Sequence, residues 1–276
     1  MNIRSYIKAA YPGIAIITAE ETRAESMLAQ IATEEDFRLF SWTLTNGMVD
    51  AISGGIVSAD TANNPIAPLD QVAHIPERSI LLLKDYQFFV DDPQVIRKLK
   101  DTLALCEQTR RCIVLLGVRI KLPPELEREI VVESMPMPTA LELEAVLDGI
   151  SKSAGVDVGE NKQAVLKAAS GMTTTEAKNA FAKAFIDSGK SGIPHEIVAK
   201  EKCAAINKGG LLTVVDSNVG LDQVGGLERL KGYLTSIKDN FTDEAMTYGL
   251  EPPAPMMVIG QPGTGKTLVS YCVGLS

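Results

Sequence analysis

Apolar and polar positions alternate regularly over about the first 137 residues of the chain. Short apolar runs predict buried strands at 13–18, 37–45, 79–85 and 111–117. Apolar residues at helical spacing predict helices at 18–31 and 92–106. The mostly polar residues 46–75 predict a long loop. Strands that alternate with helices predict an α/β domain whose parallel sheet is covered on both faces.

From Thr139 onward the pattern changes to helices alone. Thr139-Ala140-Leu141-Glu142 and Thr173-Thr174-Thr175-Glu176 are capping boxes that predict helix starts. Further apolar spacing predicts helices over about 162–169 and 193–207. We therefore expect three parts in the chain: an α/β domain at 1–137, a helical lid-like domain at 138–208 and the beginning of a further domain at 209–276.

That third part contains a complete phosphate-binding loop. The loop comprises Gly260, Gln261, Pro262, Gly263, Thr264, Gly265, Lys266 and Thr267. The apolar run at 255–259 predicts a buried parallel strand before it, and residues 268–273 predict the start of a helix after it. Strand, glycine-rich loop and helix form the context that this motif requires.

The residue types of the loop indicate ATP and Mg²⁺ as cofactors. The glycines let backbone N–H groups close around a β-phosphate, and the helix N-terminus adds partial positive charge. We expect Lys266 to reach the β- and γ-phosphates and the Thr267 hydroxyl to bind Mg²⁺. Both residues are therefore expected to be catalytic, and Thr267 is also the expected metal ligand. Leu268 and the loop residues are the expected nucleotide contacts.

The composition narrows the class of protein. At 276 residues, with 45% hydrophobic and 22% charged residues, the chain is typical of a globular protein of about two domains. It has no apolar stretch near the ~18 residues of a membrane span and no secretory core, so we expect a cytoplasmic protein. A net charge of −8 does not indicate a nucleic-acid surface. The cysteines lack metal spacing and predict free buried thiols at Cys106, Cys112, Cys203 and Cys272.

A Gly-Gly-Leu segment at 225–227 precedes the phosphate loop by about 35 residues. The pair of segments resembles the corresponding region of AAA ATPases. The resemblance implies that the backbone of Gln223, Val224 and Gly225 lines an adenine pocket. It also implies that the complete protein hydrolyses Mg-ATP and self-associates into a ring, because AAA sites usually borrow an arginine from a neighbour. It supplies no protein substrate.

The first domain has the strand and helix order of an AAA module but lacks the chemistry. Between its first strand and helix, residues 17–23 contain no glycine, and Glu20 and Glu21 lie where the phosphates would bind. These carboxylates satisfy the helix dipole and would repel a triphosphate. Thr18 and Glu21 also fit a capping box. The third strand ends in one acid, Asp85, rather than the Asp-Glu pair of the family. Asp85 is either a metal ligand or a loop or helix-cap carboxylate.

More narrowly, the whole chain resembles the plastid and cyanobacterial AAA proteins first catalogued as a hypothetical chloroplast reading frame, which also occur in phages. The resemblance is carried by residues 11–23, Trp42, 171–181, 200–202, 210–212, 225–227 and the phosphate loop. It implies a P-loop-like first domain without catalysis, a lid and one active AAA module. If the protein is plastid-encoded, its location is the stroma.

Only nine residues follow Thr267. The Walker B acids, sensors, arginine finger and second lid would therefore lie beyond residue 276. We expect a truncated chain, the N-terminal portion of an ATPase, that is hydrolysis-incompetent alone and poorly packed from about residue 212.

Two other functions stay open at this point. In one, the chain is a non-enzymatic adaptor or interaction module with a relic phosphate loop. In the other, it is a nucleotide-binding switch without hydrolysis. Binding of a fluorescent ADP analogue distinguishes the adaptor from the other two.

Overall fold

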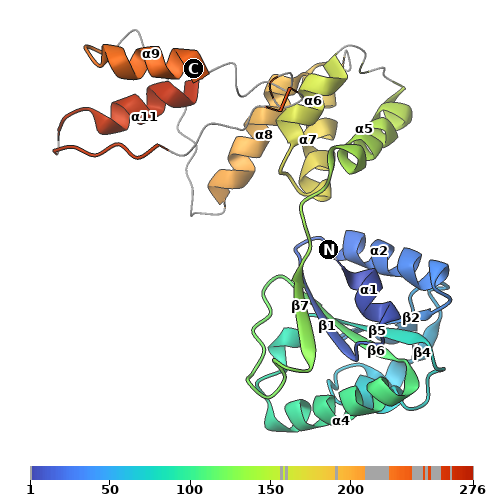
Figure 1. Cartoon of the computed structure of the whole chain (residues 1–276). Coiled ribbons are helices and arrows are strands. Elements are labelled where there is room, and N and C mark those ends of the chain that lie inside the picture. The colour runs from blue at the N-terminus through green and yellow to red at the C-terminus, as the bar shows by residue number, and fades with distance from the viewer. Residues whose placement is uncertain are drawn as a thin grey trace. The chain divides into compact units, whose positions relative to one another are not determined.

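The computed structural model divides the chain into two compact units, Met1–Lys202 and Cys203–Ser276 (Figure 1). The structure describes residues 2–155, 158, 161–189, 192–208, 224–237, 245, 248–249, 256–261 and 263–275.

A seven-stranded sheet forms the centre of the first unit, in the order β4-β3-β2-β5-β6-β1-β7. Its parallel strands are β1 (Gly13–Ile17), β2 (Arg38–Thr43), β5 (Ser79–Lys84), β6 (Cys112–Gly117) and β7 (Ile130–Ser134). Two short strands, β3 (Gly47–Asp50) and β4 (Ile56–Ser58), extend it in antiparallel fashion. The predicted α/β class with a mainly parallel sheet is confirmed.

Helices cover both faces of this sheet, as the sequence predicts (Figure 1). On one face, α1 (Ile3–Lys8) and α2 (Glu21–Glu34) pack their apolar residues against Ile14, Ile16 and neighbouring strand residues. On the other face, α3 (Ala67–Gln71) and α4 (Pro93–Thr109) pack against Ala15 and its neighbours. Alternation of side chains along the strands divides the core into these two layers.

The prediction of a long loop over 46–75 is wrong. This stretch contains β3, β4, α3 and the 3₁₀ turn η1 (Ala59–Thr61). Thr61 organises it, because its hydroxyl accepts the Met48 N–H at 2.8 Å and its carbonyl accepts the Trp42 indole N–H at 2.9 Å. Trp42 is fully buried. Specific side-chain contacts thus order a polar segment that shows little hydrophobic periodicity.

The capping box expected at Thr18 and Glu21 is also wrong. Helix α2 begins at Glu21, and its N-cap residue is Glu20, whose side chain makes no capping hydrogen bond. The Thr18 hydroxyl accepts the Glu20 N–H at 3.0 Å, whereas the Glu21 carboxylate lies 2.9 Å from the Lys84 ammonium. An opposite charge attracts Glu21 more strongly than a neutral backbone N–H does.

The helical part of the first unit comprises α5 (Ala140–Ala154), α6 (Lys162–Ala169), α7 (Thr174–Asp187) and the first residues of α8 (His195–Lys208), which continues from Cys203 into the second unit. Both predicted capping boxes are present, at Thr139 with Glu142 and at Thr173 with Glu176. The helices bury their own apolar cluster around Leu147 and Phe181. This part therefore has a core separate from the two layers of the sheet.

In the second unit, after the end of α8, the described helices are α9 (Glu228–Ile237) and α11 (Lys266–Leu275). The strand predicted at 255–259 is not formed over 256–259, and Pro255 lies outside the described residues. Met257 and Ile259 are 82% and 85% exposed. A strand depends on ladder hydrogen bonds to neighbours, and the described residues of this unit provide none here.

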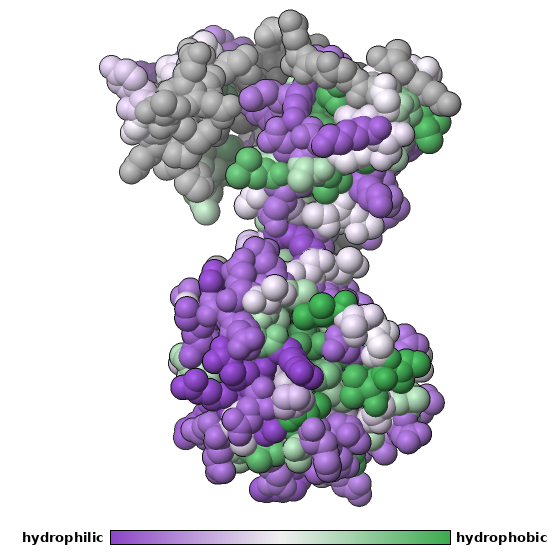
Figure 2. Space-filling model, turned by 90° about the vertical axis from the view of Figure 1, so that its right-hand side faces the viewer, coloured by the Kyte–Doolittle hydropathy of each residue, from purple (hydrophilic) through white to green (hydrophobic). Residues whose placement is uncertain are grey.

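The sheet of the first unit ends at β4, a strand of only three residues. The space-filling view of the side that carries β4 shows apolar side chains at the surface of the α/β part (Figure 2). On and beside this strand, Ile52, Ile56 and Val57 are exposed. A very short edge strand limits pairing with other chains.

The prediction of free buried thiols is confirmed for two cysteines of the sheet domain. Cys106 and Cys112 are buried free thiols, and Cys203 is a half-buried one. Burial raises the pKa of Cys106 to about 12, which keeps this thiol protonated and unreactive at neutral pH. The side chain of Cys272 lies outside the described residues.

Candidate functional site

The phosphate loop of the second unit turns sharply at two glycines and then opens helix α11. Gly263 and Gly265 have φ angles of 81° and 82°, which other residues adopt only with strain. The Thr264 hydroxyl donates to the Gln261 carbonyl at 2.8 Å and closes the turn. Pro262 lies outside the described residues. The glycines thus set the path that brings the chain into the helix.

Lys266 is the first residue of α11 and folds back over the loop. Its ammonium donates to the Gly260 carbonyl at 2.7 Å and also to the Gln261 carbonyl. Carbonyl oxygens are weak partners for an ammonium compared with charged oxygens. The side chain is therefore free to exchange these contacts for a stronger anionic partner.

Thr267 and Leu268 lie in the first turn of α11 and are exposed. In the part of the chain that the structure describes, no cluster of three or more His, Cys, Asp or Glu side chains could hold a metal ion. A single hydroxyl is only part of a Mg²⁺ site, because Mg²⁺ usually takes its other ligands from phosphates and water. Thr267 as metal ligand stays a prediction.

Val224, the residue directly before the Gly-Gly-Leu segment, contacts the helix that follows the loop. Val224 and Val269 are 7% and 4% exposed and form one apolar cluster, against which Leu230 of α9 packs. Gly225 follows Val224 directly, and Gln223 lies outside the described residues. The structure thus brings the segment expected to line an adenine pocket to α11, across 45 residues of sequence.

The corresponding position in the first unit is the carboxyl end of β1, where the chain passes into α2. Strand β1 lies between β6 and β7. From β1 the chain crosses to β2 on one side of the sheet, whereas from β6 it crosses to β7 on the other side, so the direction of the connections reverses here. In open α/β sheets, ligands bind at such topological switch points. Here Glu20 fills the position: its side chain is 6% exposed and is enclosed by the chain itself.

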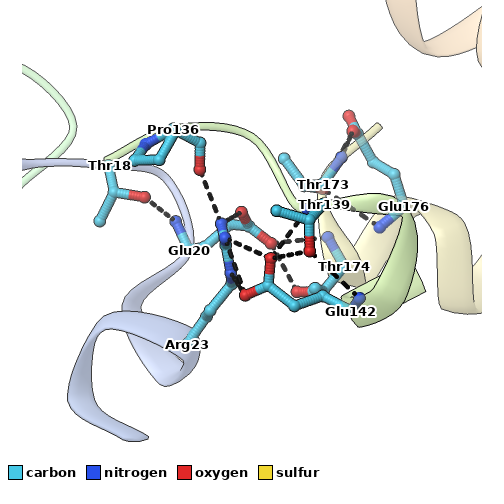
Figure 3. Close-up of polar contacts among 9 residues, drawn as sticks. All are labelled: Thr18, Glu20, Arg23, Pro136, Thr139, Glu142, Thr173, Thr174 and Glu176. Atoms are coloured by element: carbon cyan, nitrogen blue, oxygen red, sulfur yellow. Dashed lines mark hydrogen bonds and ion pairs between the residues drawn. The ribbon is translucent and has the colours of Figure 1, made fainter. Parts of the chain in front are cut away.

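Glu20 and Arg23 join a polar network, drawn in Figure 3. The backbone N–H of Thr174 donates to Glu20 Oε1 at 2.6 Å, and Arg23 Nη1 donates to Glu20 Oε2 at 2.9 Å. Arg23 also donates to both carboxylate oxygens of Glu142, at 3.1 and 3.0 Å. Burial opposes ionisation of Glu142, but hydrogen bonds from Thr139 and Arg23 outweigh it and lower the pKa of this carboxyl.

A second charged cluster lies beside the first, at the end of β5. The Lys84 ammonium is 2.9 Å from the carboxylates of Glu21 and of Glu25, one turn apart on α2. Burial disfavours the ammonium, but hydrogen bonds to Glu25 and Glu21 outweigh it and raise the pKa of Lys84. Asp85 is exposed, and its carboxylate accepts only a long hydrogen bond from Gln87 at 3.4 Å. Of its two open roles, that of a loop carboxylate fits this geometry.

Sequence reasoning placed Glu20 and Glu21 at the helix N-terminus but missed their partners. Arg23 and Glu142 are 119 residues apart, and Glu20 and Thr174 are 154 apart. The capping boxes identified Glu142 and the start of α7. No sequence pattern linked Glu142 to Arg23 or the start of α7 to Glu20. The spacing of Glu21 and Glu25 on one helix face was the available signal for Lys84.

Within the described residues, no helix has both the length and the apolar character needed to cross a bilayer. The chain matches two family models. Residues 1–135 match the N-terminal domain of SpoVK-like AAA ATPases, and residues 141–209 match the second domain of the same proteins.

The chain is also similar to curated relatives. It is 25% identical to an uncharacterized AAA domain-containing protein ycf46 of Pyropia yezoensis over 99% of this chain and 56% of that protein. The Guillardia theta protein of the same name is 26% identical over 99% of this chain and 54% of its own length. The chain thus spans about half the length of these relatives.

Among solved structures, domain III of the Thermotoga maritima replication initiation protein DnaA is similar with a TM-score of 0.45 and 13% identity, over 72% of this chain and 90% of that one. The two family models match consecutive domains of one kind of protein and together span most of the chain. The chain belongs to the SpoVK-like AAA ATPases.

Proposed function

We propose that the complete protein binds and hydrolyses Mg-ATP through residues 260–267. The observation that carries this proposal is the position of Lys266, at the start of α11 with its ammonium on the carbonyls of Gly260 and Gln261. A triphosphate in the loop would offer charged oxygens in place of these carbonyls. The ammonium would then turn to the β- and γ-phosphates.

The remaining roles follow from the chemistry of each group. The Thr267 hydroxyl binds Mg²⁺, and the loop N–H groups with the N-terminus of α11 bind phosphate. The backbone of Gln223, Val224 and Gly225 lines the adenine pocket, an assignment supported by the contact of Val224 with Val269. The complete protein self-associates, so that a neighbour supplies an arginine to each site.

The proposal is tested by titrating a fluorescent ADP analogue into the 276-residue chain with and without Mg²⁺. We expect submillimolar binding that Mg²⁺ strengthens. Lys266→Ala should abolish it, whereas Thr267→Ala should leave weak binding that no longer responds to Mg²⁺. As a matched control, Lys231→Ala, which removes a cation of α9 outside the loop, should bind as the parent does.

Hydrolysis is tested separately in a chain that extends as far as the ycf46 relatives do. We expect turnover there and its loss in Lys266→Ala, since removal of this lysine takes away the cation on the transferred phosphoryl group. Turnover that persists in Lys266→Ala would refute the assignment.

A second candidate function is a non-enzymatic adaptor. It is favoured by one observation: at the switch point of the first unit the Glu20 side chain is 6% exposed and is bonded to Arg23 and Thr174 of the chain itself. Absence of nucleotide binding both in this chain and in the longer one would favour the adaptor.

A further inference from the structure

A network of charged and polar side chains connects the α/β part to the helical part of the first unit. Figure 3 shows that side chains from the β1–α2 junction, the segment before α5 and the N-terminus of α7 converge there. Glu20 and Arg23 are 6% and 14% exposed in their side chains. Charged groups this buried are retained only when they are paired and hydrogen-bonded.

Glu20 contacts α7 as a bound anion would. Its Oε1 accepts both the backbone N–H and the hydroxyl of Thr174, the first residue of α7. The first backbone N–H groups of a helix have no partner within the helix and carry partial positive charge, which favours an anion. The Thr173–Glu176 capping box satisfies other groups at this helix end, and Glu20 satisfies the Thr174 N–H.

Arg23 makes the second connection. Its Nη1 donates to Glu20 at 2.9 Å and to the Pro136 carbonyl at 2.8 Å, and its other two nitrogens form a fork onto Glu142. Every nitrogen of the guanidinium therefore has an acceptor in the chain. Because Glu142 also accepts from Thr139, the network includes the N-terminus of α5.

We propose that Glu20 and Arg23 form a permanent clamp that fixes the helical part on the α/β part without nucleotide. The Glu20 carboxylate takes the place of an anionic ligand at the switch point and, with Arg23, holds α5 and α7 at their N-termini. A ligand that arrives and leaves would make this contact reversible, whereas a side chain of the protein makes it constant. The first unit is thus one rigid body rather than a nucleotide-driven hinge.

Spin-label distance measurements on the full chain test this clamp. Gln108→Cys on α4 and Asn179→Cys on α7 provide exposed labelling positions. Cys203→Ser and Cys272→Ser remove competing thiols, and the two buried cysteines stay unlabelled. We expect one narrow distance distribution without nucleotide. A parent distribution that is already broad would overturn the proposal.

Two variants then break the clamp. Arg23→Gln removes the fork, and Glu142→Gln removes its partner while a glutamine still serves the capping box of α5. Both should broaden the distribution. In both, the Thr174 amide should exchange with solvent faster by roughly tenfold, since opening is no longer opposed by the charged pair. The Glu142 side chain is 44% exposed, so Glu142→Gln should not disturb folding. A broader distribution in this variant is therefore due to the lost ion pair and not to misfolding.

Two controls complete the experiment. Arg97→Gln removes an exposed ion pair within α4 and should leave the distribution unchanged. In a Lys266→Ala background, which disables the second unit, about 1 mM Mg-ATP, at the upper end of usual enzyme affinities, should also leave it unchanged. The clamp is refuted if Arg23→Gln and Glu142→Gln keep the parent distribution, or if Mg-ATP shifts it in that background.

Discussion

Each unit contains a chain segment that runs through a short loop into the N-terminus of a helix, and the two loops carry opposite chemistry. At the start of α2, Glu20 and Glu21 supply negative charge, and Arg23 and Lys84 neutralise it from within the chain. Before α11, glycines expose the backbone and Lys266 rests on neutral carbonyls. At the first helix the charged side chains are paired within the chain, whereas Lys266 at the second has no charged partner among the residues that the structure describes and can offer its charge to an anion.

The region around β1 and α2 is also more tightly packed than the region around the phosphate loop. Strand β1 pairs with β6 and β7 along its whole length, and Ile14 and Ile16 are fully buried. Met257 and Ile259, ahead of the phosphate loop, are largely exposed. The first region therefore derives its stability from its own contacts. The second should gain more from a ligand, because a ligand stabilises whatever it binds only in the folded form.

The largest expected effect follows from this difference. Mg-ADP at about 100 times its Kd should stabilise the second unit by about 2.7 kcal/mol and the first unit not at all. Hydrogen exchange measured along the chain should show new protection at 256–275 and unchanged protection at 13–34. Lys266→Ala should abolish the new protection. Equal protection in both regions would mean that the segment between β1 and α2 also binds nucleotide.

A glycine of the first region serves a steric purpose, unlike those of the phosphate loop. A Cβ on Gly13 would lie 2.8 Å from Leu103 Cδ2 and 2.9 Å from Ile130 Cγ1. We expect Gly13→Ala to lower the free energy of unfolding of the first unit by about 1–3 kcal/mol through overpacking. Urea unfolding measures this change.

The matched control for this variant is Gly149→Ala. Gly149 lies in α5 with no atom within 4 Å of an added Cβ. Alanine should raise the stability there by up to about 1 kcal/mol, because it favours a helix interior more than glycine does. A Gly13→Ala chain as stable as its parent would contradict the close packing of β1 with α4 and β7.

Much of the fold could be predicted because it rests on local signals. The apolar runs gave β1, β2, β5 and β6, and the capping boxes of α5 and α7 lie within four consecutive residues each. Strand β7 was missed, since only Ile130 of its five residues is buried and its apolar signal is weak. The segment at 46–75 was missed because Thr61, a polar residue, orders it.

Of the two polar sites, one could be predicted from the sequence and the other could not. The phosphate loop could be predicted because its residues are consecutive and their spacing is specific. The clamp could not, because the bonds that connect the α/β part to the helical part join residues more than a hundred positions apart, such as Arg23 and Glu142. Predicting Glu21 as a capping residue failed for a related reason: the competing partner, Lys84, is distant in sequence.

Lys84 and Lys266 differ in burial and in their partners. Unlike Lys266, Lys84 is 11% exposed and paired with two carboxylates. Lys84→Met should cost about 1–2 kcal/mol of unfolding free energy, less than a fully buried pair would, because Glu21 can recover solvent. Thermal or urea unfolding measures it. Lys8→Met, whose side chain is 58% exposed in its pair with Glu35, should cost less than about 0.5 kcal/mol. Equal losses of unfolding free energy in the two variants would mean that the pairs of Lys84 stabilise the fold no more than the exposed pair of Lys8 does.

The smallest expected effect is the pH dependence of the clamp. The pKa of Glu142 is lowered from its ordinary value of 4.5, so its contribution to stability is fully present above pH 4.5. It is lost as the pH falls through the lowered value, when protonation removes the charge that Arg23 holds. Because the Glu142 side chain is 44% exposed, we expect less than about 1 kcal/mol.

Unfolding of the first unit at neutral pH and at stepwise lower pH measures this contribution, with Glu142→Gln as the control. Other carboxyls, Glu35 and Asp101 among them, also have lowered pKa values and weaken the parent in acid. The informative quantity is therefore the difference between parent and Glu142→Gln, which should be largest at neutral pH and shrink in acid. A constant difference would mean that Glu142 acts through its shape rather than its charge. The phosphate loop has no carboxylate of its own, so its affinity for Mg-ADP should show no matching acid-induced loss from this cause.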